Sequence, residues 1–219
     1  MGNSACVLTG DIIGSSRSPH MNVDAAMATL SQAADHFERW RPRGTLPRFT
    51  RYRGDGWHMV ISDPARALRA AMYLRATLRA ADLGLETRLS IGIGDVQTLG
   101  TKDLSDATGA AFLWSGRGLD RMGRSHTMTI DGEDVTPMHS AVIILAAERS
   151  RRWSAEQAEA ISLALDSSIA TQADIARRLS ISVQAVNHRL TGGGFQALRE
   201  AIDIWENPQL WQLHRGKVA

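Results

Sequence analysis

In the first 93 residues, segments whose apolar residues alternate as in a strand take turns with segments whose apolar residues have helical spacing. Few folds have elements in this order. The strand-like segments are 5–11, 48–53, 57–61 and 87–93, and the helical segments between them are 23–39 and 65–81. Gly54-Asp55-Gly56 joins the second and third strands as a hairpin. This order is that of the ferredoxin-like split βαβ arrangement, an antiparallel sheet with helices on one face. The sequence therefore predicts an α+β fold of this type, continued by a helix over 109–122 and a short strand over 127–130.

A second, all-helical domain is expected at the C-terminal end of the chain. Helical patterns cover 134–151 and 154–165, with Ser154 and Gln157 as a capping box, and helices continue to about residue 205. We place the boundary so that the first domain spans 1–148 and the second spans 149–219. In the last helical pattern, Phe195, Leu198, Ile202 and Trp205 form an apolar face for packing or for a dimer contact.

The stretch TQADIARRLSISVQAVNHRL, residues 171–190, has the spacing of a helix-turn-helix motif, with a buried apolar residue in the turn. Two apolar stripes are expected to be buried; they are Ile175, Ala176 and Leu179, and Val183, Val186 and Leu190. The second helix would then expose Gln184, Asn187, His188 and Arg189, whose polar groups can reach base edges in a DNA major groove. An ordinary helical pair that packs on the first domain or on a partner chain remains the alternative.

The composition argues against a membrane-spanning protein and a disulfide-rich one. Among 219 residues, 43% are hydrophobic, which supports a real core, and no apolar run is long enough to cross a membrane. The single cysteine, Cys6, excludes an internal disulfide framework and a cysteine metal cluster. The start of the chain does not read as a signal peptide, so we expect a cytoplasmic protein. A net charge of +2 with interspersed acids does not indicate a general nucleic-acid surface.

Two acidic residues are expected to meet at one edge of the predicted sheet. In the ferredoxin-like order the first strand lies beside the hairpin, so Asp11 and Asp55 would project together. Two close carboxylates repel each other unless a cation lies between them, and Mg²⁺ carrying a nucleoside triphosphate would meet that need. Gly14, Ser15 and Ser16 follow at once, and their N–H groups ahead of a helix suit a phosphate. Ordinary turns explain the same residues, since Asp, Gly and Ser are common in turns and hairpins.

Four stretches, GDIIGSS, RYRGDGW, RLSIGIGDV and SDATGAAFLWSGRGLDRM, resemble the palm-type class III nucleotidyl cyclase domain and, more closely, the SatD family of bacterial proteins. The resemblance spans the first two-thirds of the chain, and the C-terminal helices also fit SatD-like proteins. It implies Mg²⁺ or Mn²⁺ held by Asp11, Asp55 and the backbone carbonyl of Ile12. It implies base selection by Arg51 and Asp106, and charge stabilisation on the reacting phosphates by Arg117. It also implies a homodimer, because cyclases of this fold share their site between two chains.

One position departs from the cyclase pattern. Leu113 stands four residues before Arg117, where cyclases carry an asparagine that positions the ribose. Asp106 is equally well explained as a helix cap, and Arg117 as a residue of a solvated helix face. We therefore expect a cytoplasmic regulator that senses a metal-bound nucleotide and contacts DNA. The alternatives are an active cyclase, which forms a cyclic nucleotide and pyrophosphate, and an interaction protein that has lost the site.

Overall fold

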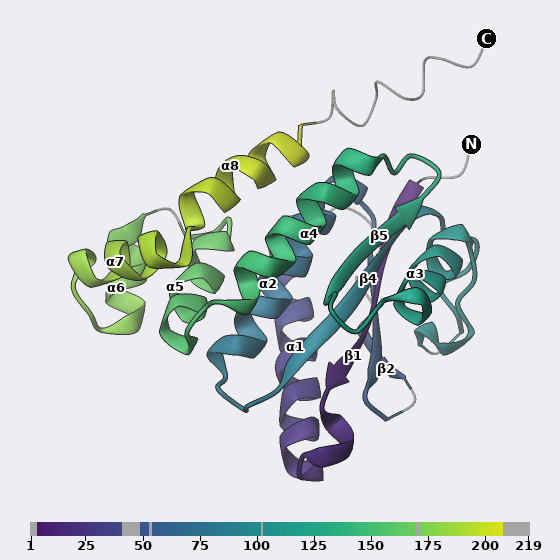
Figure 1. The fold of residues 1–219 in the computed structure, drawn as a ribbon, viewed down its shortest axis with the longest axis horizontal. Helices are drawn as coiled ribbons and strands as arrows, with labels where there is room; N and C mark the ends of the chain where they lie inside the picture. Colours follow the sequence, from purple (N-terminus) through teal and green to yellow (C-terminus); the bar gives the residue numbers. More distant parts are fainter. Residues whose placement is uncertain (1–3, 41–48, 53, 102, 170, 208–219) are drawn as a thin grey trace.

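The computed structural model describes residues 4–40, 49–52, 54–101, 103–169 and 171–207. Their five-stranded sheet has the order β2-β3-β1-β4-β5 (Figure 1). The strands are β1 (Ser4–Ile13), β2 (Phe49–Tyr52), β3 (Gly56–Ile61), β4 (Glu86–Asp95) and β5 (Met128–Gly132). β1 pairs antiparallel with both β3 and β4, and β2 pairs antiparallel with β3. The predicted α+β class is confirmed. Residue 48 and residue 53, at the ends of the predicted second strand, lie outside the described residues.

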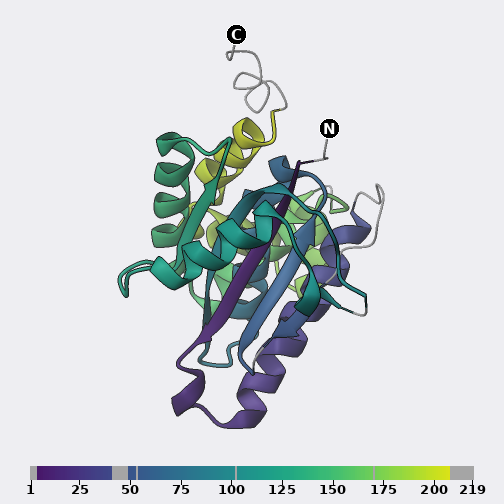
Figure 2. The ribbon, with the colours of Figure 1, turned by 90° about the vertical axis from the view of Figure 1, so that its right-hand side faces the viewer.

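The helices lie on both faces of this sheet. They are α1 (His20–Arg39), α2 (Ala67–Ala80), α3 (Ala110–Arg121), α4 (Pro137–Arg151), α5 (Ala155–Leu165), α6 (Gln172–Leu179), α7 (Val183–Gly193) and α8 (Phe195–Trp205). Figure 2 shows α3, in teal, crossing in front of the sheet while α1, in purple, lies behind it. The helices of the first six predicted elements, α1 and α2, lie on one face of the sheet, as the sequence predicted. The other face is covered because the chain after β4 crosses to it as α3 and returns as β5, which pairs parallel with β4.

The alternation of side chains along β1 separates two cores. Cys6 and Leu8 face α1 and α2 in the large core, where burial raises the pKa of the Cys6 thiol. Val7 faces the other way and joins a small cluster with Val60, Leu104 and Ala111 beneath α3. Cys6 is fully buried and serves as an apolar core residue.

The C-terminal helices belong to the same continuous core as the sheet. The predicted apolar face of α8 is buried, with Phe195, Leu198, Ile202 and Trp205 between 0 and 7% exposed. That face packs inside the chain, which removes it as a dimer surface. The Arg69 guanidinium on α2 binds both carboxylate oxygens of Glu206, just beyond α8, at 2.6 and 2.8 Å. Residue 148 lies within α4, and the proposed division into two domains stays a prediction.

The predicted start of α5 is confirmed, and four of the six apolar side chains expected to be buried in α6 and α7 are buried, whereas Leu179 is only partly buried. Ser154 caps α5 through the predicted box with Gln157, and Thr171 and Ser182 cap α6 and α7. Val186 and Leu190 are buried, but Val183 is 47% exposed. Ser180 adopts a left-handed conformation at the end of α6, and the turn that follows leaves the first residue of α7 facing solvent.

Candidate functional site

Asp11 lies near the end of β1 on the face that carries α3. Cross-strand register places it opposite Arg88 of β4. The Arg88 guanidinium donates from Nε to Asp11 Oδ1 at 2.7 Å and from Nη2 to Oδ2 at 2.8 Å. Both oxygens of the predicted metal ligand are therefore held by one arginine in the two-point geometry that suits a guanidinium and a carboxylate.

Asp55 lies in the hairpin loop beside the same end of β1. Asp11 is the register partner of Gly56, and the Ile12 N–H donates to the Asp55 backbone carbonyl at 3.2 Å. The Ser15 hydroxyl donates to the Asp55 carboxylate. Asp11 and Asp55, 44 positions apart in the chain, thus share one corner of the sheet, as the topology predicted.

Arg88 lies among acidic side chains, which raise the pKa of its guanidinium. The hydrogen bond to Asp11 raises the pKa of the Arg88 guanidinium, partial burial opposes this, and the charges of Asp11, Asp55 and Asp120 raise it further. Asp120 lies near the end of α3, so the sheet and the helix both bring negative charge to Arg88. The Arg88 and Asp11 side chains are 37% and 23% exposed, so solvent screens this pair only in part.

The oxygen donors of this corner suit a hard divalent cation, with one obstacle. Two carboxylates and the backbone carbonyl of Ile12 are ligand types that Mg²⁺ and Mn²⁺ accept. In the described part of the chain, however, no group of three or more His, Cys, Asp or Glu residues is arranged to hold a metal ion. A cation at Asp11 would also meet the positive charge of Arg88, which already binds both carboxylate oxygens. The donor set fits a cation that brings most of its ligands as water or phosphate oxygens.

The predicted phosphate loop forms a tight turn between β1 and α1. Gly14 is left-handed, with φ of 82°, and Ser15 to Arg17 make one 3₁₀ turn. The Ser15 hydroxyl is engaged by Asp55, and the Ser16 side chain is exposed. Within the turn, the N–H groups of Arg17 and Ser18 bond to the carbonyls of Gly14 and Ser15. The loop is therefore tied to the aspartate corner by Ser15.

Arg51 and Asp106, the predicted base-selecting pair, lie on opposite faces of the sheet. Arg51 extends toward α1, where its Nη1 donates to Asp24 at 2.7 Å. Asp106 lies on the α3 side and accepts hydrogen bonds from the Thr101 N–H and hydroxyl, which close its own loop. The structure does not bring these two side chains together.

Arg117 and Leu113 share the outer side of α3. Arg117 is exposed, and Leu113 is 49% exposed. Arg117 forms no ion pair with Asp11 or Asp55, although all three belong to the described residues. The sequence also allowed Asp106 to cap the start of α3. In the structure Asp95 does this instead, because its carboxylate accepts a hydrogen bond from the Ala110 N–H at 3.1 Å.

Sequence reasoning missed a polar chain beneath α3. The Thr9 hydroxyl lies 2.9 Å from His58 Nδ1 and 2.8 Å from the buried Ser115 hydroxyl. Burial lowers the pKa of the His58 imidazole. Sequence reasoning also missed Arg88; its place before Leu89 was the available signal, because alternation along β4 directs the two side chains to opposite faces.

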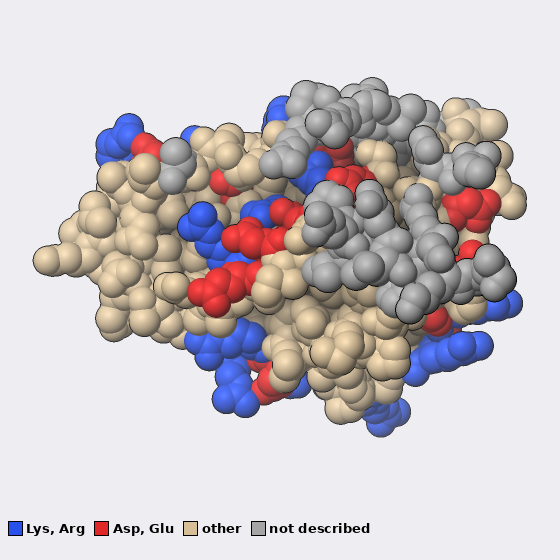
Figure 3. All heavy atoms as spheres, turned by 90° about the horizontal axis from the view of Figure 1, so that it is seen from above, with Lys and Arg blue, Asp and Glu red and all other residues tan. Residues whose placement is uncertain are grey.

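The predicted DNA-contacting residues do not all face solvent. Gln184, Asn187 and His188 are exposed on α7. Arg189 is turned toward α5, where its Nη1 donates to the Glu159 carboxylate at 2.8 Å. Figure 3 shows acidic and basic side chains mixed on one face of the molecule.

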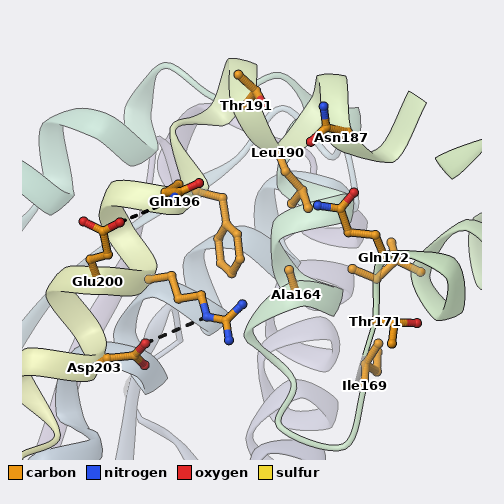
Figure 4. Close-up of a pocket in the computed structure, with 13 residues that line it drawn as sticks. Ala164, Ile169, Thr171, Gln172, Asn187, Leu190, Thr191, Gln196, Glu200 and Asp203 are labelled. Carbon is orange, nitrogen blue, oxygen red and sulfur yellow. Dashed lines mark hydrogen bonds and ion pairs between the residues drawn. The ribbon is translucent and has the colours of Figure 1, made fainter. Parts of the chain in front are cut away.

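A hollow of about 330 Å³ lies between α5, α6, α7 and α8 (Figure 4). Ile175, Leu190 and Phe195 give it an apolar wall, and the amides of Gln172, Asn187 and Gln196 lie around it. Asn187 therefore belongs to the wall of this hollow as well as to the exposed surface of α7.

None of the helices in the described ranges combines the length and apolar character needed to cross a membrane. The sequence matches no family model and no curated protein. Among solved structures, a crystal structure of the guanylyl cyclase Cya2 is similar, with a TM-score of 0.41 and 15% sequence identity. The match covers 67% of this chain and 81% of that chain. These values assign the chain to no family, and the resemblance to the SatD family stays a prediction.

Proposed function

We propose that the chain binds a nucleoside triphosphate together with Mg²⁺ or Mn²⁺ at the corner formed by Asp11 and Asp55. The observation that carries the proposal is the juxtaposition of these residues, with Asp11 opposite Gly56 and Ile12 N–H bonded to the Asp55 carbonyl. Two carboxylates at one sheet corner favour a cation between them, and a triphosphate supplies the remaining oxygen ligands.

In this proposal each part of the corner has a separate task. Asp11, Asp55 and the Ile12 carbonyl would hold the cation, which would neutralise phosphate charge. The Ser15 hydroxyl donates to the Asp55 carboxylate, and this bond would hold the turn of Gly14 to Ser16 in place for the phosphates. Leu113 offers no hydrogen bond to a ribose, and Arg117 lies on the outer face of α3. These two features favour binding over turnover, and a homodimer would let Arg117 of one chain approach the corner of the other.

The binding proposal is tested by thermal unfolding of the purified chain with each of the four nucleoside triphosphates, with and without Mg²⁺ or Mn²⁺. We expect at least one pair to raise the melting temperature of the wild type and to leave Asp11→Asn and Asp55→Asn unshifted. Asp35→Asn, an exposed change on α1, is the matched control and should respond as the wild type does. No shift with any nucleotide and cation would overturn the proposal.

We further propose that α6 and α7 act as a DNA-binding helix-turn-helix, which would make the chain a cytoplasmic regulator. Support comes from the short helix pair and from the exposed Gln184, Asn187 and His188. Arg189 contributes less than its sequence position suggested, because Glu159 holds it. Because Lys and Arg only slightly outnumber Asp and Glu from residue 149 onward, binding would depend on two half-sites read by a homodimer.

The DNA proposal can be tested by selecting binders from a pool of random double-stranded 30-mers and measuring fluorescence anisotropy. The double variant Gln184→Ala and Asn187→Ala should lower the affinity for the selected DNA at least about tenfold. Gln32→Ala, exposed on α1, should leave the affinity unchanged. Absence of any selected sequence would leave α6 and α7 as a packing element.

The alternative function is an active nucleotidyl cyclase, favoured by the same Asp11 and Asp55 corner. In that reaction the ribose 3′-oxygen bonds to the α-phosphorus while the bond to pyrophosphate breaks. Mass spectrometry of each triphosphate incubated with the protein and Mn²⁺ would detect the cyclic product. Product that is lost in Asp55→Asn would establish the alternative.

A further inference from the structure

Arg88 is the only basic residue bound to Asp11 among the described residues, and it engages the carboxylate completely. Its Nε and Nη2 meet the two Asp11 oxygens at 2.7 and 2.8 Å. Register fixes the two backbones opposite each other on adjacent strands, so the contact does not depend on a mobile loop. The chain thus supplies its own cation at the carboxylate where the proposed divalent cation would bind.

The guanidinium and a divalent cation would compete for the same carboxylate. A Mg²⁺ or Mn²⁺ ion at Asp11 would approach an oxygen that already accepts a hydrogen bond from the guanidinium, and the two positive charges would repel each other at that distance. Arg88 can leave without a large desolvation penalty, because its side chain is 37% exposed and can extend into water. Asp55 is held by Ser15 rather than by an arginine, so the obstacle lies at Asp11 alone.

We propose that Arg88 is a latch on Asp11, which a divalent cation must open before it binds at the Asp11–Asp55 corner. The latch is a regulatory feature of the proposed nucleotide site, and so it rests on the proposed function. With the latch closed, the positive charge of Arg88 neutralises the Asp11 carboxylate in the absence of metal. Free divalent cation alone therefore binds weakly to the wild type.

The test measures Mn²⁺ binding by the electron paramagnetic resonance signal of free Mn²⁺, with no nucleotide present. Loss of a charge-assisted hydrogen-bonded partner should let Arg88→Met bind Mn²⁺ about tenfold to a hundredfold more tightly than the wild type. Arg88→Lys keeps the charge but loses the two-point contact, and its affinity should be intermediate. Arg152→Met removes an exposed surface pair with Glu148 at 2.6 Å and is the matched control, with wild-type affinity expected.

Equal Mn²⁺ affinity in Arg88→Met and the wild type would overturn the latch. So would wild-type affinity in Arg88→Lys, because charge alone would then set the affinity. If these variants bind alike but nucleotide with metal still stabilises the wild type, only the latch fails. If no variant binds Mn²⁺ and no nucleotide shifts the melting temperature, the proposed function fails as well.

A second measurement needs no substitution and covers the case in which Arg88→Met does not fold. Titration of the wild type with Mg²⁺ should shift the ¹⁵N resonance of Arg88 Nε together with the ¹³C carboxyl resonance of Asp11. A shift at Asp11 with an unmoved Arg88 Nε would show that metal binds without opening the latch.

Discussion

Gly92 of β4 lies against the backbone of Ala111 in α3, so closely that a Cβ on Gly92 would sit 2.0 Å from the Ala111 carbonyl oxygen. The same Cβ would lie 2.5 Å from the Ser115 backbone nitrogen. This approach lets α3 bring the Ser115 hydroxyl to Thr9 and the Asp120 charge toward Arg88. The position of α3 over the aspartate corner thus depends on the missing side chain at Gly92.

Gly92→Ala should destabilise the fold by at least about 3 kcal/mol, because both contacted groups are backbone and no rotamer change can relieve them. Chemical denaturation with urea measures the loss. Gly116→Ala is the matched control within α3, since its Cβ would meet nothing within 4 Å. It should be neutral or stabilising by about 0.5–1 kcal/mol, as expected for alanine in a helix. Equal effects of the two changes would contradict the close packing.

Local features of the fold could be predicted from the sequence more fully than contacts between distant segments. The Ser154 and Gln157 capping box could be predicted because both partners lie within four residues. The meeting of Asp11 and Asp55 could be predicted from topology, because adjacent strands bring their ends together. The face on which Arg88 lies could be predicted from the alternation along β4, but its contact with Asp11 could not, because that contact depends on the register between β1 and β4.

The placement of α3 and of Arg51 was also beyond the sequence. Gly92 acts through an absent side chain, which leaves no hydrophobic pattern to mark the face that α3 covers. Arg51 alternates with Thr50 along β2, and only the observed packing shows that Thr50 faces the Leu104 loop while Arg51 meets Asp24. Val183 was predicted buried from helical spacing, which does not include the turn that precedes α7.

Arg149 of α4 anchors the end of α7. Its Nε and Nη2 donate to the carbonyls of Gly193 and Gly192 at 2.8 and 2.9 Å, and Gly194 continues the chain with a left-handed φ of 67°. Arg149→Met should cost about 1–3 kcal/mol, because a charged donor to helix-end carbonyls is lost. Urea denaturation measures the cost, and hydrogen exchange should speed up first in α7.

Arg152→Met provides the comparison for Arg149, because Arg152 lies three residues further along and is 72% exposed. Its surface ion pair with Glu148 is screened by solvent, so its loss should leave the stability nearly unchanged. If the two variants lose the same stability, the contact between Arg149 and the glycines does not hold α7 in place.

Asp166 links α1 to the C-terminal helices and should make stability depend on acid. Burial alone would raise the pKa of this carboxyl, but hydrogen bonds from Ser168 and His36 outweigh burial and lower it. The folded state therefore favours the ionised form of Asp166 more than the unfolded chain does. This contribution is complete above about pH 4, near the ordinary pKa of Asp, and is lost as the pH falls through the lower folded pKa.

The acid dependence is checked by urea denaturation between pH 7 and pH 3. Asp166→Asn should lose about 1–3 kcal/mol at pH 7, because the His36 contact at 2.8 Å is weakened, and should lose less than the wild type on acidification. Asp35→Asn, exposed on α1, controls for removal of one negative charge. Parallel curves for Asp166→Asn and the wild type would exclude Asp166 as a source of the acid dependence.

Leu113 offers a direct test of whether the corner is built for turnover. The side chain is 49% exposed on the outer side of α3, so Leu113→Asn should change the free energy of unfolding by less than about 0.5 kcal/mol. If the cyclase resemblance holds, an asparagine four residues before Arg117 can position a ribose. We then expect Leu113→Asn to raise formation of cyclic nucleotide at least about tenfold over the wild type, measured by mass spectrometry with Mn²⁺.

Two further variants decide what a gain of product from Leu113→Asn means. The gain should vanish when Asp55→Asn is added, because the cation would lose a ligand. Leu145→Asn, which replaces a 71% exposed leucine on α4, should leave product formation at the wild-type level. Nucleotide binding that is retained in Leu113→Asn without any product would mean that orientation of the ribose is not the missing element. In that case the corner would act by binding alone, and Arg117 on the outer side of α3 would have no reacting phosphate to stabilise.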